Sequence, residues 1–121
     1  MSTPFRNDIR RGELYWLDWS PGRGSEQAGR RPALIVGSDA ANANDRYPLT
    51  IVVAVSTTQR NILTHVVLEP DDDNGLRARS SAKCEQLLTV SKDRLLEKIG
   101  RVSDTDLERV SVALKRALTL P

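Results

Sequence analysis

The apolar residues of the chain gather in short runs, separated by stretches rich in polar residues, glycine and proline. Most runs are too short for a helix, and β-branched residues dominate the strongest one, so we expect strands. The predicted strands are Leu14–Trp19, Ala33–Val36, Thr50–Val55, Thr64–Leu68, a polar-apolar strand supplied by Ser81–Cys84 and Gln86–Val90, and Ile99–Val102. Ala33–Val36 is apolar without interruption, which predicts a strand buried on both faces.

A helical pattern follows the last predicted strand. Ser103 and Asp106 have the spacing of a capping box, and the pattern behind them predicts a helix that runs to about Leu118. One apolar stripe on this helix is formed by Leu107, Val110, Leu114 and Ala117 or Leu118. Ser91 is suited to cap a shorter helix over Lys92–Lys98.

The remaining segments predict irregular structure. Met1–Arg10 lacks apolar periodicity and is expected to be a frayed end. Asp39–Pro48 is polar and suits one helical turn, and Pro70–Gly75 is a turn. Several short strands with one terminal helix predict a mostly β fold with a C-terminal helix (α+β), built as a small, curled, mostly antiparallel sheet. At 121 residues, we expect one domain over the whole chain.

The longest loop lies between the first two predicted strands and reads P-G-R-G-S-E-Q-A-G-R-R-P, from Pro21 to Pro32. It is longer than a hairpin turn requires, and its glycines allow positive φ or a close approach to a ligand. Glu26 stands among the guanidinium groups of Arg23, Arg30 and Arg31. Composition alone favours a solvated connector, whereas the mixture of charges beside glycines suits a mobile loop over an anionic ligand.

Composition limits the classes of function. The net charge is +2 and most of the 18 basic residues are arginines, which pair with phosphate and stack on bases, so charge makes nucleic acid a modest favourite as partner. No run approaches the ~18 apolar residues of a membrane span, and the N-terminus lacks an apolar signal core. Cys84 is the only cysteine and His65 the only histidine, so we expect a cytoplasmic protein with no internal disulfide, no metal site and no cofactor.

The order of the motifs resembles that of one toxin family. G-S-E-Q-A-G-x-R-P directly after R-G-E-L-Y-W-L-D is similar to the signature of MazF/PemK toxin endoribonucleases, and S-T-T-Q, C-E-Q-L-L-T-V and a final amphipathic helix follow in the family's order. The resemblance covers Arg11 to Leu118. It implies an SH3-like small barrel of the MazF/PemK/CcdB type and a homodimer. It also implies a cognate antitoxin whose acidic C-terminal segment fills a groove. The implied activity is sequence-specific cleavage of single-stranded mRNA to 2′,3′-cyclic phosphate and 5′-hydroxyl ends.

Metal-free RNA cleavage needs a base for the 2′-OH proton, groups that stabilise the phosphorane and an acid for the 5′ oxygen. Many nucleases of this kind use a pair of histidines as acid and base, but one protomer of this chain has only His65. The groups that remain for catalysis are a carboxylate, an arginine and a hydroxyl. Glu26 is the candidate base, with a solvated loop carboxylate as the alternative. By resemblance, Arg31 is the catalytic Arg of the R-P pair and Thr57 the active-site Thr. The expected RNA-binding residues are Arg23, Ser25, Gln27, Arg30, Thr58, Gln59 and Gln86.

Other interpretations of these residues stay open. Lys83 interrupts a strand that is usually apolar in the family, so it is either exposed or adds charge near the groove. His65 is expected to be a satisfied structural histidine. Trp16 and Trp19 suit base stacking, although paired aromatics are more often core or interface. A gyrase-binding toxin of the CcdB type and a non-catalytic RNA- or peptide-binding barrel are the alternative functions.

Overall fold

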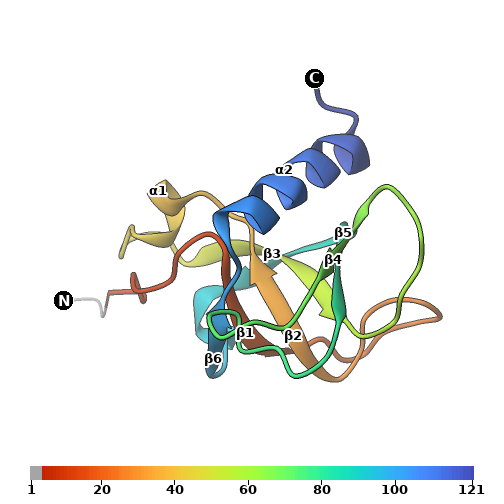
Figure 1. The fold of residues 1–121 in the computed structure, drawn as a ribbon. Coiled ribbons are helices and arrows are strands. Elements are labelled where there is room, and N and C mark those ends of the chain that lie inside the picture. Colours follow the sequence, from red (N-terminus) through yellow and green to blue (C-terminus); the bar gives the residue numbers. More distant parts are fainter. Residues whose placement is uncertain (1–3) are drawn as a thin grey trace.

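The computed structural model describes residues 4–121, in which six strands form one antiparallel sheet. The strands are β1 (Glu13–Asp18), β2 (Arg30–Ile35), β3 (Leu49–Ser56), β4 (His65–Leu68), β5 (Ser80–Ser91) and β6 (Lys98–Arg101). Their order across the sheet is β4-β5-β3-β2-β1-β6. The helices are α1 (Asp39–Asn42), the 3-10 turn η1 (Lys92–Arg94) and α2 (Asp104–Leu118). The sheet curls into a half-barrel and α2 lies across one face of it (Figure 1), which confirms the predicted fold class.

The β2 strand lies in the middle of the sheet, and its apolar part, Ala33–Ile35, is buried on both faces, as the uninterrupted apolar run predicts. Leu34 packs on the α2 side with Val53 and Val55 of β3. Ala33 and Ile35 point to the opposite face and pack in a second cluster. Successive side chains of a strand alternate between faces, so a continuous apolar run is what a two-sided core requires.

The predicted C-terminal helix and its cap are confirmed. The Ser103 hydroxyl accepts a hydrogen bond from the Asp106 backbone N–H at 3.1 Å, and α2 begins at Asp104. Val110 and Ala113 are buried against the sheet, while Leu118 is 53% exposed. The apolar stripe therefore runs from Leu107 through Val110, Ala113 and Leu114, and it ends before Leu118.

The prediction of a frayed N-terminus is wrong for the part of it that the structure describes; residues 1–3 lie outside that part. Ile9 is fully buried in the second core cluster, and the Phe5 backbone N–H donates to the Asp45 carbonyl at 2.8 Å. A single isoleucine between polar residues shows no apolar periodicity, so the spacing of apolar residues cannot predict its burial.

The strand predicted from Ser81–Cys84 and Gln86–Val90 is confirmed as β5, which continues through Glu85 but is irregular there. Ala54 of β3 pairs with Lys83, but the preceding residue Val53 pairs with Leu87, so the residues from Cys84 to Gln86 bulge out of register. A bulge of this kind redirects side chains away from the regular alternation. It places Glu85 and Gln86 at one edge of the cavity described below.

The predicted helix over Lys92–Lys98 is also wrong. Only the single turn η1 forms, and the Ser91 side chain makes no capping hydrogen bond. Lys98 instead pairs with Tyr15 of β1 and begins β6, so pairing at the sheet edge outweighs the local helical preference.

The Pro70–Gly75 turn packs closely against β6. Gly75 has φ +67°, and a Cβ added there would lie 2.2 Å from the Ile99 carbonyl oxygen, so only glycine fits without a backbone shift. The buried Asn74 side chain donates to the Glu69 carbonyl at 2.8 Å and accepts from the Leu76 N–H at 2.9 Å. The residues that follow this turn are thereby fixed beside β1 and β6. No helix within residues 4–121 is long and apolar enough to span a membrane.

Candidate active site

The loop between β1 and β2 is anchored at several points. Gly24 and Gly29 have positive φ values of 61° and 72°. The Gly29 N–H donates to the Ser20 hydroxyl at 2.9 Å, and the Trp19 N–H donates to the Gly29 carbonyl at 2.8 Å. In Figure 1 this orange loop extends on the same side of the sheet as the connection between β3 and β4. The two loops border one end of the half-barrel.

The amides of Gln27 and Gln86 hold this loop on the sheet. Gln27 is only 8% exposed, and its side-chain amide donates to the Val55 carbonyl at 2.8 Å. Its backbone N–H donates to the Gln86 side-chain oxygen at 3.0 Å. The Gln86 amide in turn reaches the Ser25 carbonyl at 3.4 Å. The Gln27 amide N–H is thus bonded to the β3 backbone, and RNA binding by Gln27 stays a prediction.

A cavity of about 510 Å³ opens beside the loop, and we refer to it as cavity A. Acidic, basic and uncharged polar side chains all line it. Its lining comprises Gly24, Ser25, Glu26, Gln27, Ala28, Arg31, Ser56, Thr58, Arg60, Ile62, His65, Lys83, Glu85 and Gln86. The loop, the end of β3, the start of β4 and the β5 bulge thus meet at one place.

Glu85 is the most tightly held carboxylate of cavity A. One of its oxygens accepts from the Thr64 hydroxyl at 3.1 Å and the other lies 2.8 Å from His65 Nε2. Burial raises the pKa of Glu85, but hydrogen bonds from His65, the backbone and Thr64 outweigh burial, so the pKa lies below its ordinary value of 4.5. Glu85 therefore remains ionised at neutral pH.

His65 is buried at the edge of cavity A, with 2% of its side chain exposed. Its Nε2 is bonded to Glu85, whereas Nδ1 is buried and has no hydrogen-bond partner among the described residues. The expectation of a satisfied structural histidine is thus met at only one of the two ring nitrogens.

Lys83 is 7% exposed and lines the same cavity. Burial lowers the pKa of its ammonium group, with Glu85 opposing this effect and Arg60 adding to it. Of the two expectations for Lys83, added charge near the groove is the one that the structure supports. Sequence reasoning missed Glu85 as a site residue. The polar interruption S-A-K-C-E-Q in an otherwise apolar strand is the signal that points to it.

The lowered pKa of Glu85 predicts a pH-dependent contribution to stability. A carboxylate whose pKa is lower in the folded protein stabilises the fold above its unfolded value, near 4.5, and this contribution is lost as the pH falls through the lower folded value. Glu85→Gln keeps a hydrogen-bond acceptor but removes the charge. We expect it to lower the melting temperature at pH 7 and to approach the wild type at pH 3 and below, as followed by circular dichroism.

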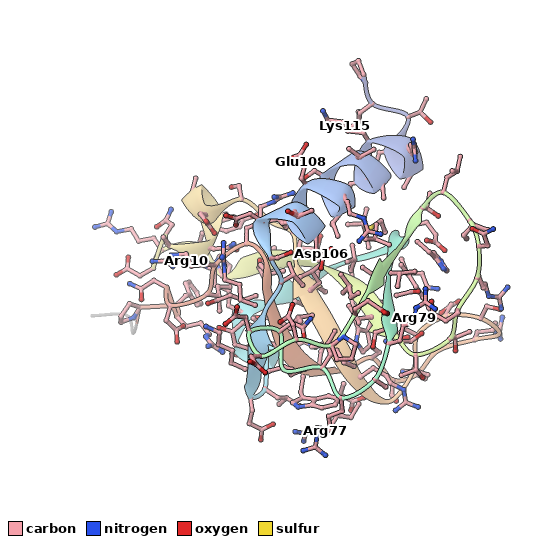
Figure 2. The ribbon with its side chains drawn as sticks, in the orientation of Figure 1. Arg10, Arg77, Arg79, Asp106, Glu108 and Lys115 are labelled. Carbon is pink, nitrogen blue, oxygen red and sulfur yellow. The ribbon has the colours of Figure 1, made fainter. Side chains whose placement is uncertain are left out.

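Glu108→Gln is the control for this experiment, because Glu108 points away from the sheet on α2 (Figure 2). This control should differ little from wild type at either pH. A melting-temperature difference for Glu85→Gln that stayed constant from pH 7 to pH 3 would contradict the assigned cause of the pKa shift.

A second cavity of about 550 Å³, cavity B, lies on the other side of Arg31. Its lining combines apolar, hydroxyl and cationic side chains and contains no carboxylate among the described residues. The lining residues are Trp16, Arg30, Arg31, Pro32, Thr57, Gly75, Leu76, Arg77, Ala78, Ser80 and Ile99. Arg31 is the residue that the two linings share. The hydroxyl-bearing Thr57 thus lies on one side of Arg31 and the carboxylate of Glu26 on the other.

The other expected RNA-binding residues lie around these two cavities. Ser25 and Thr58 line cavity A. Gln59 is exposed beside it, and its side-chain oxygen accepts from the Ser81 hydroxyl at 3.0 Å. Arg23 is exposed at the loop tip and lines neither cavity. Arg30 lines cavity B and pairs with Glu97.

A curled antiparallel sheet with a helix across one face and a loop-bordered cavity defines a small SH3-like barrel. Residues 10–118 match the family of PemK-like, MazF-like toxins of type II toxin-antitoxin systems, and the chain belongs to this family. Endoribonuclease MazF9 of Mycobacterium tuberculosis is 37% identical to it over 116 residues, which cover 93% of this chain and 98% of the relative.

Solved structures agree with the family assignment. An endoribonuclease from a mycobacterial species superposes with a TM-score of 0.78 at 29% identity, with 97% of each chain covered. An endoribonuclease in complex with its cognate antitoxin, also mycobacterial, gives a TM-score of 0.78 at 29% identity over 93% of this chain and 97% of that one. MazF from Deinococcus radiodurans gives 0.76 at 25% identity, with 93% and 97% covered. The fold of the chain is therefore that of MazF toxins.

Proposed function

We propose that the chain is the toxin of a type II toxin–antitoxin pair and acts as a sequence-specific, metal-independent endoribonuclease on single-stranded RNA. One observation carries the proposal: Arg31 stands between a carboxylate-lined cavity and a hydroxyl- and arginine-lined one, in a chain similar to a named endoribonuclease. A guanidinium in this position can hold the phosphate that the two neighbouring nucleotides share.

The chemistry uses the substrate's own 2′-hydroxyl as nucleophile. A carboxylate takes its proton while O2′ bonds to phosphorus, and the bond from phosphorus to O5′ breaks to leave a 2′,3′-cyclic phosphate. Glu26 is the proposed base. Arg31 and the Thr57 hydroxyl stabilise the charge that develops on the phosphorane oxygens. Lys83, with its pKa lowered by burial, is suited to give a proton to the leaving O5′.

The same groove suits the antitoxin. A structural neighbour is described in complex with its cognate antitoxin. An acidic C-terminal segment would offer carboxylates to the arginines that otherwise hold phosphate, and it would displace the loop from Ser20 to Arg30. We further propose that the toxin works as a homodimer in the cytoplasm.

Cleavage should survive excess EDTA, because the 2′-OH is the nucleophile and side-chain cations supply the charge stabilisation. The test incubates the purified protein with a long single-stranded RNA in EDTA and looks for discrete bands on a gel. Activity that vanished with EDTA and returned with magnesium would contradict the proposed chemistry. Intact RNA together with tight binding to DNA gyrase would instead support the CcdB-like alternative.

A further inference from the structure

We propose that cavity B binds a nucleobase of the RNA, which stacks on the guanidinium of Arg30 while Trp16 supports that guanidinium from behind. The inference rests on the proposed function and adds a subsite to it. It assigns cavity B to the base and sugar of a nucleotide next to the phosphate at Arg31.

Trp16 is held in place from both edges of β1. The backbone N–H of Trp16 donates to the Glu97 carbonyl at 3.0 Å, and its backbone carbonyl accepts from the Leu96 N–H at 2.9 Å. On the other edge it stands opposite Pro32 in the register of β1 and β2. The indole is only partly exposed and lines cavity B. A backbone that is paired on both edges makes Trp16 a rigid support.

Arg30 covers the indole and keeps one face open. Its guanidinium carbon lies 5.5 Å from the centre of the Trp16 ring, and a guanidinium nitrogen pairs with Glu97. About half of the side chain, 54%, is still exposed. Since the guanidinium lies over the indole and more than half of the side chain stays exposed, the side turned away from the indole is available to a planar ligand. Guanidinium planes and aromatic rings are the surfaces on which unstacked RNA bases stack.

The rest of cavity B favours a nucleotide over other planar molecules. Arg31 and Thr57 supply phosphate-binding groups at one side, and Leu76 and Ile99 provide apolar wall. Arg77 adds another cation, and Figure 2 shows its side chain directed away from the sheet on the outer surface. An apolar slot rimmed by cations, without a carboxylate in its lining, matches a base attached to an anionic backbone. Cavity A, by contrast, carries Glu26 and Glu85.

The test compares two short strands that cannot be cleaved. One is a random-sequence 2′-O-methyl RNA pool, and the other is an abasic strand of the same length, which keeps the phosphates but lacks bases. Arg30→Lys keeps the charge and loses the plane. We expect it to weaken binding of the pool by about 5- to 150-fold, the equivalent of the ~1–3 kcal/mol that stacking one base contributes. Its affinity for the abasic strand should stay near that of wild type.

Trp16→Leu, which removes the support, should show the same selective loss. Arg79→Lys is the matched control, because Arg79 also forms an exposed ion pair, with Glu69, but lines neither cavity. This control should bind both strands like wild type. Circular dichroism of each variant verifies that it is folded.

Two results would overturn the stacking site. One is an equal loss of Arg30→Lys affinity for both strands, with RNA cleavage by the wild type intact, which would leave Arg30 as a phosphate contact only. The other is fluorescence quenching of Trp16 by an acidic peptide but not by the RNA pool, with Trp19→Phe used to isolate the Trp16 signal. That result would give cavity B to a peptide partner. If the wild type cleaved no RNA and bound neither strand, the proposed function itself would fail.

Discussion

Arg31→Ala is expected to abolish toxicity on overexpression and to slow RNA cleavage ~30- to 1000-fold. This range corresponds to the loss of about 2–4 kcal/mol of transition-state stabilisation when a phosphate-facing charge is removed from the site. Arg31 is the residue that the linings of both cavities share, so its loss removes the cation at their junction. The rate is measured in single-turnover cleavage of a defined RNA.

The protein should remain folded without the Arg31 side chain. That side chain is exposed, and its one hydrogen bond within residues 4–121 runs to the carbonyl of the adjacent Arg30, at 2.9 Å. Arg31→Lys should recover little activity, because an ammonium lacks the planar fork that pairs with two phosphate oxygens. Arg46→Ala, at an exposed arginine after α1, is the matched control and should cleave normally. Near-normal cleavage by Arg31→Ala would remove Arg31 from the site.

Glu26→Gln is expected to lower the cleavage rate by ~100-fold or more while RNA binding is kept. Glutamine preserves size and hydrogen bonding but cannot accept the 2′-OH proton. Affinity for an RNA with a 2′-deoxy residue at the cut site should stay near wild type, or tighten as repulsion between the carboxylate and phosphate disappears. The pair of values, single-turnover rate and affinity for this analogue, is measured on the same variant.

The structure sharpens this test in two ways. If Glu26 only shaped the loop, an ion pair with Arg30 would be one way to do so. Arg30 instead pairs with Glu97. Glu85 is a second carboxylate in cavity A, and Glu85→Gln therefore serves as the comparison. A parallel drop of rate and affinity in Glu26→Gln would move the base role off Glu26. A selective loss of rate in Glu85→Gln instead would assign that role to Glu85.

Periodicity and turn chemistry predict most of this fold because they are local properties. The two-sided burial of β2, the Ser103 cap and the apolar stripe of α2 all follow from residue order over a few positions. The β5 bulge does not, because it depends on how Val53 and Ala54 register against a strand about thirty residues away. Glu85 lines cavity A because of that bulge. Since the bulge cannot be predicted from local sequence, the place of Glu85 in the cavity cannot be predicted either.

Side-chain roles within the loop were predictable only in part. The motif correctly marks the segment that borders both cavities, and Glu26 and Arg31 lie there. The burial of Gln27 follows from a contact with the Val55 carbonyl on a different strand, which no local pattern contains. A side-chain amide can bond to a base edge or to a backbone carbonyl equally well. The hydrogen-bond partner of the Gln27 amide is therefore known only from the three-dimensional structure.

The chemistry of the cleaved ends decides whether the protein cuts RNA through the substrate's 2′-hydroxyl. A long single-stranded RNA is incubated with the purified protein in EDTA, and the 5′ ends of the fragments are sequenced and tested for phosphorylation by a polynucleotide kinase. We expect cuts at one recurring short sequence, 5′-hydroxyl ends that the kinase labels without prior phosphatase treatment, and 2′,3′-cyclic phosphate at the opposite ends. Fragments with 5′-phosphate ends, or RNA that stays intact, would contradict this expectation.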